Sequence, residues 1–138
     1  MAYIMLVGTD AALLEGLSQS LAALGHRPMV ASTVAEARER AATNTPLVMI
    51  VDRTVASAEG AALLALPLAP GGARLVYRTA ATAPAPLLPA LGRSVLADLM
   101  LPLERQRLSA LVKSVSDRAT TTGRTAEGRG QGQRVSEA

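Results

Sequence analysis

Short runs of apolar residues alternate along the chain with segments in which apolar residues recur every three or four positions. The apolar runs lie at residues 3–7, 29–30, 47–51, 75–77 and 95–99, and each predicts a β-strand. The segments with helical periodicity lie at residues 11–24, 33–42, 60–66 and 103–118. Because strands alternate with helices, the pattern predicts an α/β fold: a doubly wound, five-stranded parallel sheet covered on both faces.

Signals at the helix ends and along one face support these helices. Asp10 stands at an N-cap position, and Gly25 stands where the first helix should stop. The residues expected to face the core are Leu14, Leu17, Leu21 and Leu24 in the first helix, Val34, Ala37 and Ala41 in the second, and Leu108, Leu111, Val112 and Val115 in the last. Residues 79–92 hold three prolines, so we expect a loop there, with at most a distorted turn or two at residues 87–91.

The composition changes after Arg118. Residues 119–138 are rich in Gly, Thr, Gln and Arg and hold one large aliphatic residue, Val135. Such a segment buries too little apolar surface to offset the entropy lost on ordering. We therefore predict one domain at residues 1–118 and a flexible, disordered tail at residues 119–138.

Composition and charge exclude several classes of function. The chain has no Cys and one His, which excludes disulfides, thiolate nucleophiles and multi-histidine metal sites. The net charge of +3 is scattered, and Phe and Trp are absent, so we do not expect a nucleic-acid surface. The apolar run near the N-terminus is too short to span a membrane, and we expect a cytoplasmic protein with no membrane contact.

Candidate site residues lie at the carboxyl ends of the predicted strands, where open parallel sheets place their binding sites. These ends carry Gly8, Thr9, Asp52, Thr79 and residues 99–102. Asp10 follows Thr9 directly, although its position favours the role of a helix cap.

Four motifs, in order and at matching spacing, resemble the receiver domain of bacterial response regulators. They are RPMVASTVAEA, LVMIVD ending in Asp52 and followed by Gly60, RLVYRTA with Thr79, and ADLMLP with Pro102. The resemblance implies the flavodoxin-like strand order 2-1-3-4-5, with an irregular or shortened fourth helix. It also implies that Asp52 occupies the phosphoacceptor position and that Thr79 occupies the position of the conserved hydroxyl residue.

The chain departs from the receiver pattern at the residues that carry the chemistry. Receivers hold magnesium with an acidic pair after the first strand, where this chain has Gly8 and Thr9. Leu101 stands at the position of the phosphate-binding lysine, and Asp98 stands at the aromatic switch position. The resemblance therefore implies a degenerate pseudo-receiver with a vestigial Asp52, no cofactor, and lost or weak magnesium binding.

Charged residues near these positions do not replace the missing ones in the sequence pattern. Arg53 and Arg78 should point away from Asp52 by strand alternation, so neither is a strong substitute for the lysine. Asp52 is expected to bind Thr9, Thr79 or a nearby arginine, and Asp98 is expected to form a local ion pair.

The preferred hypothesis is a non-enzymatic receiver-like domain that acts in two-component signal transduction or regulation through protein–protein contact. A regulatory partner, or a second copy, would bind the face of the fourth helix, fifth strand and fifth helix. The alternative is a sensor that binds a small ligand in the vacated pocket walled by Gly8, Thr9, Thr79 and Leu101. An enzyme of Rossmann type is disfavoured, because no glycine-rich phosphate loop follows the first strand.

Overall fold

The computed structural model describes residues 2–83 and 85–132, with side chains as far as Thr120. The elements in chain order are β1 (Tyr3–Val7), α1 (Ala11–Ala23), β2 (Arg27–Ala31), α2 (Val34–Thr43), β3 (Val48–Asp52), α3 (Arg53–Ala58), α4 (Gly60–Leu64), β4 (Ala73–Arg78), α5 (Pro89–Ser94), β5 (Val95–Met100) and α6 (Arg105–Gly132).

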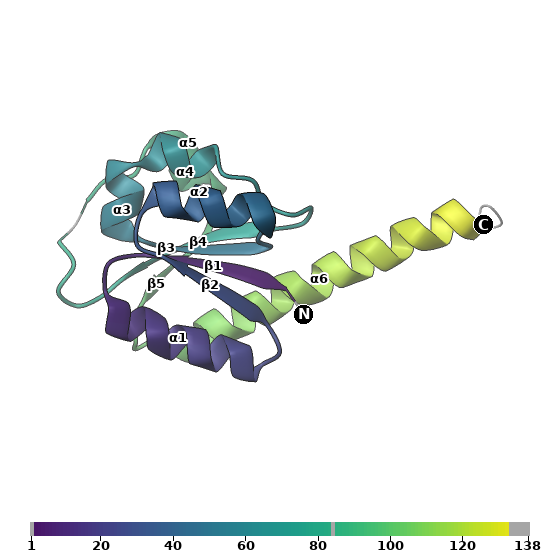
Figure 1. Ribbon diagram of the computed structural model, residues 1–138, viewed down its shortest axis with the longest axis horizontal. Helices are drawn as coiled ribbons and strands as arrows, with labels where there is room; N and C mark the ends of the chain where they lie inside the picture. The colour runs from purple at the N-terminus through teal and green to yellow at the C-terminus, as the bar shows by residue number, and fades with distance from the viewer. Residues whose placement is uncertain (1, 84, 133–138) are drawn as a thin grey trace.

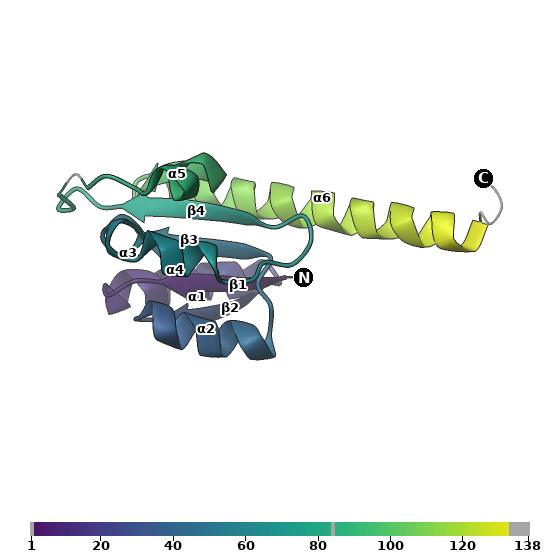
Figure 2. The same ribbon diagram turned by 90° about the horizontal axis from the view of Figure 1, so that it is seen from above.

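The five strands form one parallel sheet in the order β2-β1-β3-β4-β5. Helices α1 and α6 cover one face of the sheet, and α2, α3, α4 and α5 cover the other (Figures 1 and 2). The predicted fold class, its strand order and its shortened helix before the fifth strand are confirmed.

Each face of the sheet has its own apolar core, because both faces of the central strands are covered. On the α1 and α6 side, Leu14, Leu17, Leu21, Leu108, Val112 and Val115 pack on β-strand residues such as Ile4 and Ile50. On the other side, Val34, Ala37 and Ala41 pack with Met5, Met49 and Leu63. The predicted core face was wrong at Leu24, which is 58% exposed because it lies past the end of α1.

The predicted ends of α1 are confirmed. Asp10 is the N-cap, and its Oδ1 accepts a hydrogen bond from the backbone N–H of Leu13 at 3.1 Å. Gly25 follows the helix with a φ of 92°, a left-handed conformation that glycine adopts without steric cost.

The segment between β3 and β5 holds more helix than the sequence predicted. A helix at residues 53–58 was not predicted, and it forms where Asp52 caps its first turn. The turn expected at residues 87–91 is α5, which begins at Pro89 and continues to Ser94. Proline fits this start because the first helical residue needs no N–H partner.

The last helix is longer than predicted. It was expected to end at Arg118, but α6 continues to Gly132 and projects beyond the sheet (Figure 2). Residues 119–132 hold no proline, so no residue in this segment breaks the helix outright, although each of the four glycines at positions 123, 128, 130 and 132 costs about 1 kcal/mol relative to alanine. A flexible tail from residue 119 stays a prediction, and residues 133–138 lie outside the described part of the chain.

Within the described residues, no helix combines the length and the apolar character that crossing a bilayer requires.

Candidate functional site

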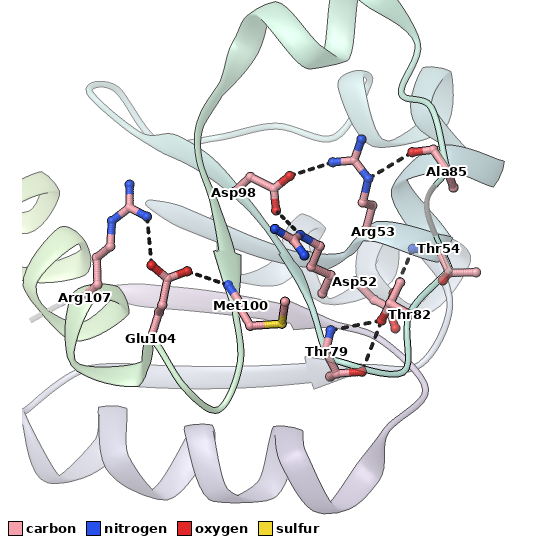
Figure 3. Close-up of polar contacts among 11 residues, drawn as sticks. Asp52, Arg53, Thr54, Thr79, Thr82, Ala85, Asp98, Met100, Glu104 and Arg107 are labelled. Atoms are coloured by element: carbon pink, nitrogen blue, oxygen red, sulfur yellow. Dashed lines mark hydrogen bonds and ion pairs between the residues drawn. The ribbon is translucent and has the colours of Figure 1, made fainter.

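Asp52 lies at the carboxyl end of β3 and is half-buried. Its Oδ1 accepts a hydrogen bond of 2.8 Å from the backbone N–H of Thr54 (Figure 3). Asp52 therefore caps α3 in the way that Asp10 caps α1. The sequence had predicted a partner among Thr9, Thr79 and the arginines, and the amide of Thr54 takes that place.

Gly8 is buried directly after β1, whereas Thr9 is exposed. The N–H of Gly8 donates to the carbonyl of Ala31 at 3.1 Å, which continues the pairing of β1 with β2. A Cβ added at Gly8 would overlap the hydroxyl of Tyr77 and would lie 3.3 Å from the Cβ of Asp52. The space beside Gly8 is therefore already filled.

Tyr77 fills this space, and sequence reasoning missed it as a site residue. It lies on β4 in register with Asp52 on β3, is 1% exposed, and its Oη has no hydrogen-bond partner among the residues that the structure describes. Burial first, and then the carboxylates of Asp52 and Asp10, raise the pKa of this phenol above its usual value of 10. The available signal was composition, because Tyr77 is one of only two aromatic residues in the chain.

Leu101 belongs to the core rather than to a charged site. It is 1% exposed, packs with the α1 and α6 core, and its N–H donates to the carbonyl of Arg78 at 2.8 Å. The peptide bond to Pro102 is cis. A buried leucine at this position supplies no cation for an anionic group.

Thr79 is held by its neighbour Thr82. The N–H of Thr79 donates to Oγ1 of Thr82 at 3.0 Å, and the two hydroxyl oxygens lie 3.2 Å apart (Figure 3). The hydroxyl of Thr79 is therefore engaged within its own loop.

Four of the predicted pocket residues line one open pocket of about 520 Å³: Asp10, Thr79, Leu101 and Pro102. Leu13, Ala80, Ala81, Met100 and Leu103 complete its wall. Gly8, Thr9 and Asp52 are not part of that wall. The pocket wall is mainly apolar, and the pocket lies beside the Asp52 position rather than over it.

Asp98 forms the ion pair that the sequence predicted. Its Oδ2 lies 2.7 Å from Nη1 of Arg53 (Figure 3). Its Oδ1 lies 3.8 Å from Nε of Arg78. Arg53 also donates through Nε to the carbonyl of Ala85 at 2.9 Å. Both arginines therefore form ion pairs with Asp98. That neither of them replaces the lysine stays a prediction.

The oxygen ligands at this edge do not fit a receiver-type magnesium site. In the described part of the chain, no group of three or more His, Cys, Asp or Glu residues is placed to hold a metal ion. Asp52 and Asp10 each already cap a helix, and the position of a third carboxylate holds Gly8 with the Tyr77 hydroxyl against it.

Comparison with solved structures places this fold among receiver domains. NtrX from Brucella abortus, crystallised with ADP, is similar with a TM-score of 0.70 and 14% identity over 93% of this chain, which covers 29% of the NtrX chain. A CheY-like receiver domain from Methylobacillus flagellatus gives a TM-score of 0.66 and 16% identity, covering 83% of this chain and 98% of that one.

A further CheY-like receiver domain, from Methanospirillum hungatei JF-1, gives a TM-score of 0.61 and 18% identity, covering 88% of this chain and 98% of that one. No protein-family model matches the chain, and no curated protein matches it. The chain thus has the receiver-domain fold, at a level of identity that speaks for the fold alone.

Proposed function

We propose that the chain is an atypical receiver domain, of pseudo-receiver type, that acts in signal transduction or regulation by binding another protein. In this proposal it is a cytoplasmic, non-enzymatic domain that needs no cofactor, and Asp52 is not phosphorylated in a magnesium-dependent way. The observation that carries the proposal is the combination of a filled space at Gly8 and a buried aliphatic side chain at Leu101.

The chemistry of phosphoryl transfer supports this reading. An aspartate attacking a phosphoryl donor needs a metal ion and a cationic side chain to offset the negative charge gathered there. Asp52 has a capping amide as its hydrogen-bond partner, and the nearest arginine in sequence, Arg53, is paired with Asp98. Charge repulsion between Asp52 and an incoming phosphoryl group is therefore left uncompensated.

A binding role is supported by apolar residues around α5 and β5. Leu88, just before α5, is 44% exposed, and Leu96 on β5 is 46% exposed. Exposed large aliphatic side chains are candidates for contact with another protein. We propose that a regulatory partner, or a second copy of the chain, covers the face formed by α5, β5 and α6.

The phosphorylation part of this proposal is tested by incubating the protein with acetyl phosphate and magnesium and measuring its intact mass. The expected spectrum holds only the unmodified mass. The matched control is Asp52→Asn, which keeps a capping side chain but removes the carboxylate that would accept the phosphoryl group. A receiver domain known to be phosphorylated verifies that the phosphodonor is active. A phosphoryl adduct that is present in the wild type and absent from Asp52→Asn would refute the proposal.

The contact surface is tested separately with Leu88→Ser and Leu96→Ser. Light scattering after size exclusion measures self-association, and cross-linking in a lysate followed by mass spectrometry identifies bound partners. We expect both substitutions to reduce the contact that the wild type makes, while Leu24→Ser, at an exposed leucine on another face, should not. Equal contact in all four proteins would refute the assigned surface.

A second candidate function, a small-molecule sensor, is favoured by the pocket of about 520 Å³ at the same edge. Its wall is largely aliphatic, and Asp10 and Thr79 supply the polar groups. A ligand that binds only the folded state raises the Tm with concentration. A panel of small neutral compounds should then include some whose Tm shift disappears in Leu103→Ser, since Leu103 is 85% exposed at the pocket rim.

A further inference from the structure

The Tyr77 hydroxyl is a buried polar group for which the described residues supply no hydrogen-bond partner. Tyr77 is 1% exposed, and its Oη makes no hydrogen bond within the described structure. Most buried polar atoms in proteins are paired, so an orphaned hydroxyl needs an explanation. A phenylalanine would fill the same core without this cost.

The position of the hydroxyl supplies the explanation. Oη stands where any side chain at position 8 would have to begin, because a Cβ built at Gly8 overlaps it. The same built Cβ would lie 3.3 Å from the Cβ of Asp52 and 3.5 Å from Cδ1 of Leu14, so the space around it is packed on these sides as well. Gly8 and Tyr77 are therefore complementary, and a carboxylate at position 8 requires either that the Tyr77 side chain moves or that a smaller residue replaces it.

A third carboxylate would matter at this edge because two are already there. Asp52 and Asp10 both act electrostatically on the Tyr77 phenol, which places it in the field of both carboxylates. Hard divalent cations are held by several oxygen ligands, usually with more than one carboxylate. A carboxylate at position 8 would begin 3.3 Å from the Cβ of Asp52 and two residues before Asp10, so it would add a third carboxylate to this edge.

We propose that Tyr77 acts as a plug, meaning that its phenol fills the space next to Asp52 in which a cation-binding side chain at position 8 would lie. The loss of metal binding then depends on position 77 as well as on positions 8 and 9. The inference deepens the proposed function and rests on it. It states that restoring acidic residues after β1 is not sufficient to restore a cation site while the phenol remains in place.

The experiment uses the full chain in four forms: wild type, Gly8→Asp/Thr9→Asp, Tyr77→Leu, and the combined triple variant. Leucine at position 77 keeps an apolar core side chain and removes the aromatic ring with its hydroxyl. Isothermal titration with Mg²⁺ measures cation affinity, and circular dichroism melting verifies that each form is folded. We expect the triple variant to bind Mg²⁺ at least tenfold more tightly than any of the other three.

Each other result has a distinct meaning. Equal affinity in Gly8→Asp/Thr9→Asp and in the triple variant would overturn the plug while leaving the proposed function intact. A folded triple variant without Mg²⁺ binding would overturn it as well. Tight binding by the wild type would instead refute the proposed function.

A second measurement does not depend on metal binding or on a new buried charge. Gly8→Ala adds only the Cβ, so it should lower the Tm by several degrees in the wild type and by much less in the Tyr77→Leu background. An equal loss of Tm in both backgrounds would overturn the steric contact on which the plug depends.

Discussion

Replacing Tyr77 by phenylalanine should stabilise the protein. The substitution removes one oxygen and keeps the ring that packs with the α1 and α6 core. Because Oη is buried and has no hydrogen-bond partner in the described part of the chain, the folded state bears the cost of taking this hydroxyl out of water without a hydrogen bond in return. The unfolded chain bears no such cost, so Phe favours the folded state.

The expected gain follows from the cost of an unpaired buried hydroxyl, about 1–3 kcal/mol. In a chain of this size that gain corresponds to a rise in Tm of about 4 °C for each kcal/mol. Urea denaturation at neutral pH, followed by circular dichroism, measures the free energy of unfolding directly. The control is Tyr3→Phe, because Tyr3 lies at the other end of the sheet and is only half-buried.

A decrease in the free energy of unfolding of Tyr77→Phe would refute this reasoning. If Tyr77→Phe lowers the free energy of unfolding by about 1 kcal/mol or more, the hydroxyl is engaged in a stabilising hydrogen bond. Its proximity to Gly8 would then reflect that bond rather than a plug.

Three further predictions concern neighbouring groups. Burial raises the pKa of Tyr77 above its usual value of 10, so the wild type should lose stability as the pH rises above 10. In thermal melts at alkaline pH, Tyr77→Phe should lose less stability than the wild type. Asp52→Ala should cost about 1 kcal/mol in urea denaturation, whereas Asp52→Asn should cost little, because asparagine caps a helix as well as aspartate does. The Met100 N–H lowers the pKa of Glu104 below its usual value of 4.5, so stability that is present above that pH should fall with acidification, and Glu104→Gln should show a flatter acid limb.

The sheet and most helices could be predicted because their signals are local. The apolar run of β1, the leucine spacing of α1 and the Asp10 cap each lie within a few consecutive residues. Boundaries were less predictable where tertiary contacts decide them. Nothing in the short segment after β3 distinguished a helix from a loop until Asp52 was seen to cap it.

From the sequence, the site could be predicted only as a receiver site that lacks its acidic pair and its lysine. The sequence identified Gly8 and Leu101 as departures from the receiver pattern, but it could not tell what replaces the missing groups. The contact between Tyr77 and Gly8 depends on the register of β3 with β4 and on the pairing of β1 with β3. The Arg53–Asp98 pair joins residues 45 apart in sequence, and its specific geometry is equally invisible in a linear pattern.

The central claim is that the edge beside Asp52 cannot hold a divalent cation well enough to accept a phosphoryl group. It is tested most directly by titrating ¹⁵N-labelled protein with Mg²⁺ and following the amide signals of Gly8, Thr54 and Thr79 by NMR. The account predicts that these signals show only the small linear drift of ionic strength. Saturable shifts of the Gly8 and Thr54 amides at low millimolar Mg²⁺ would contradict it.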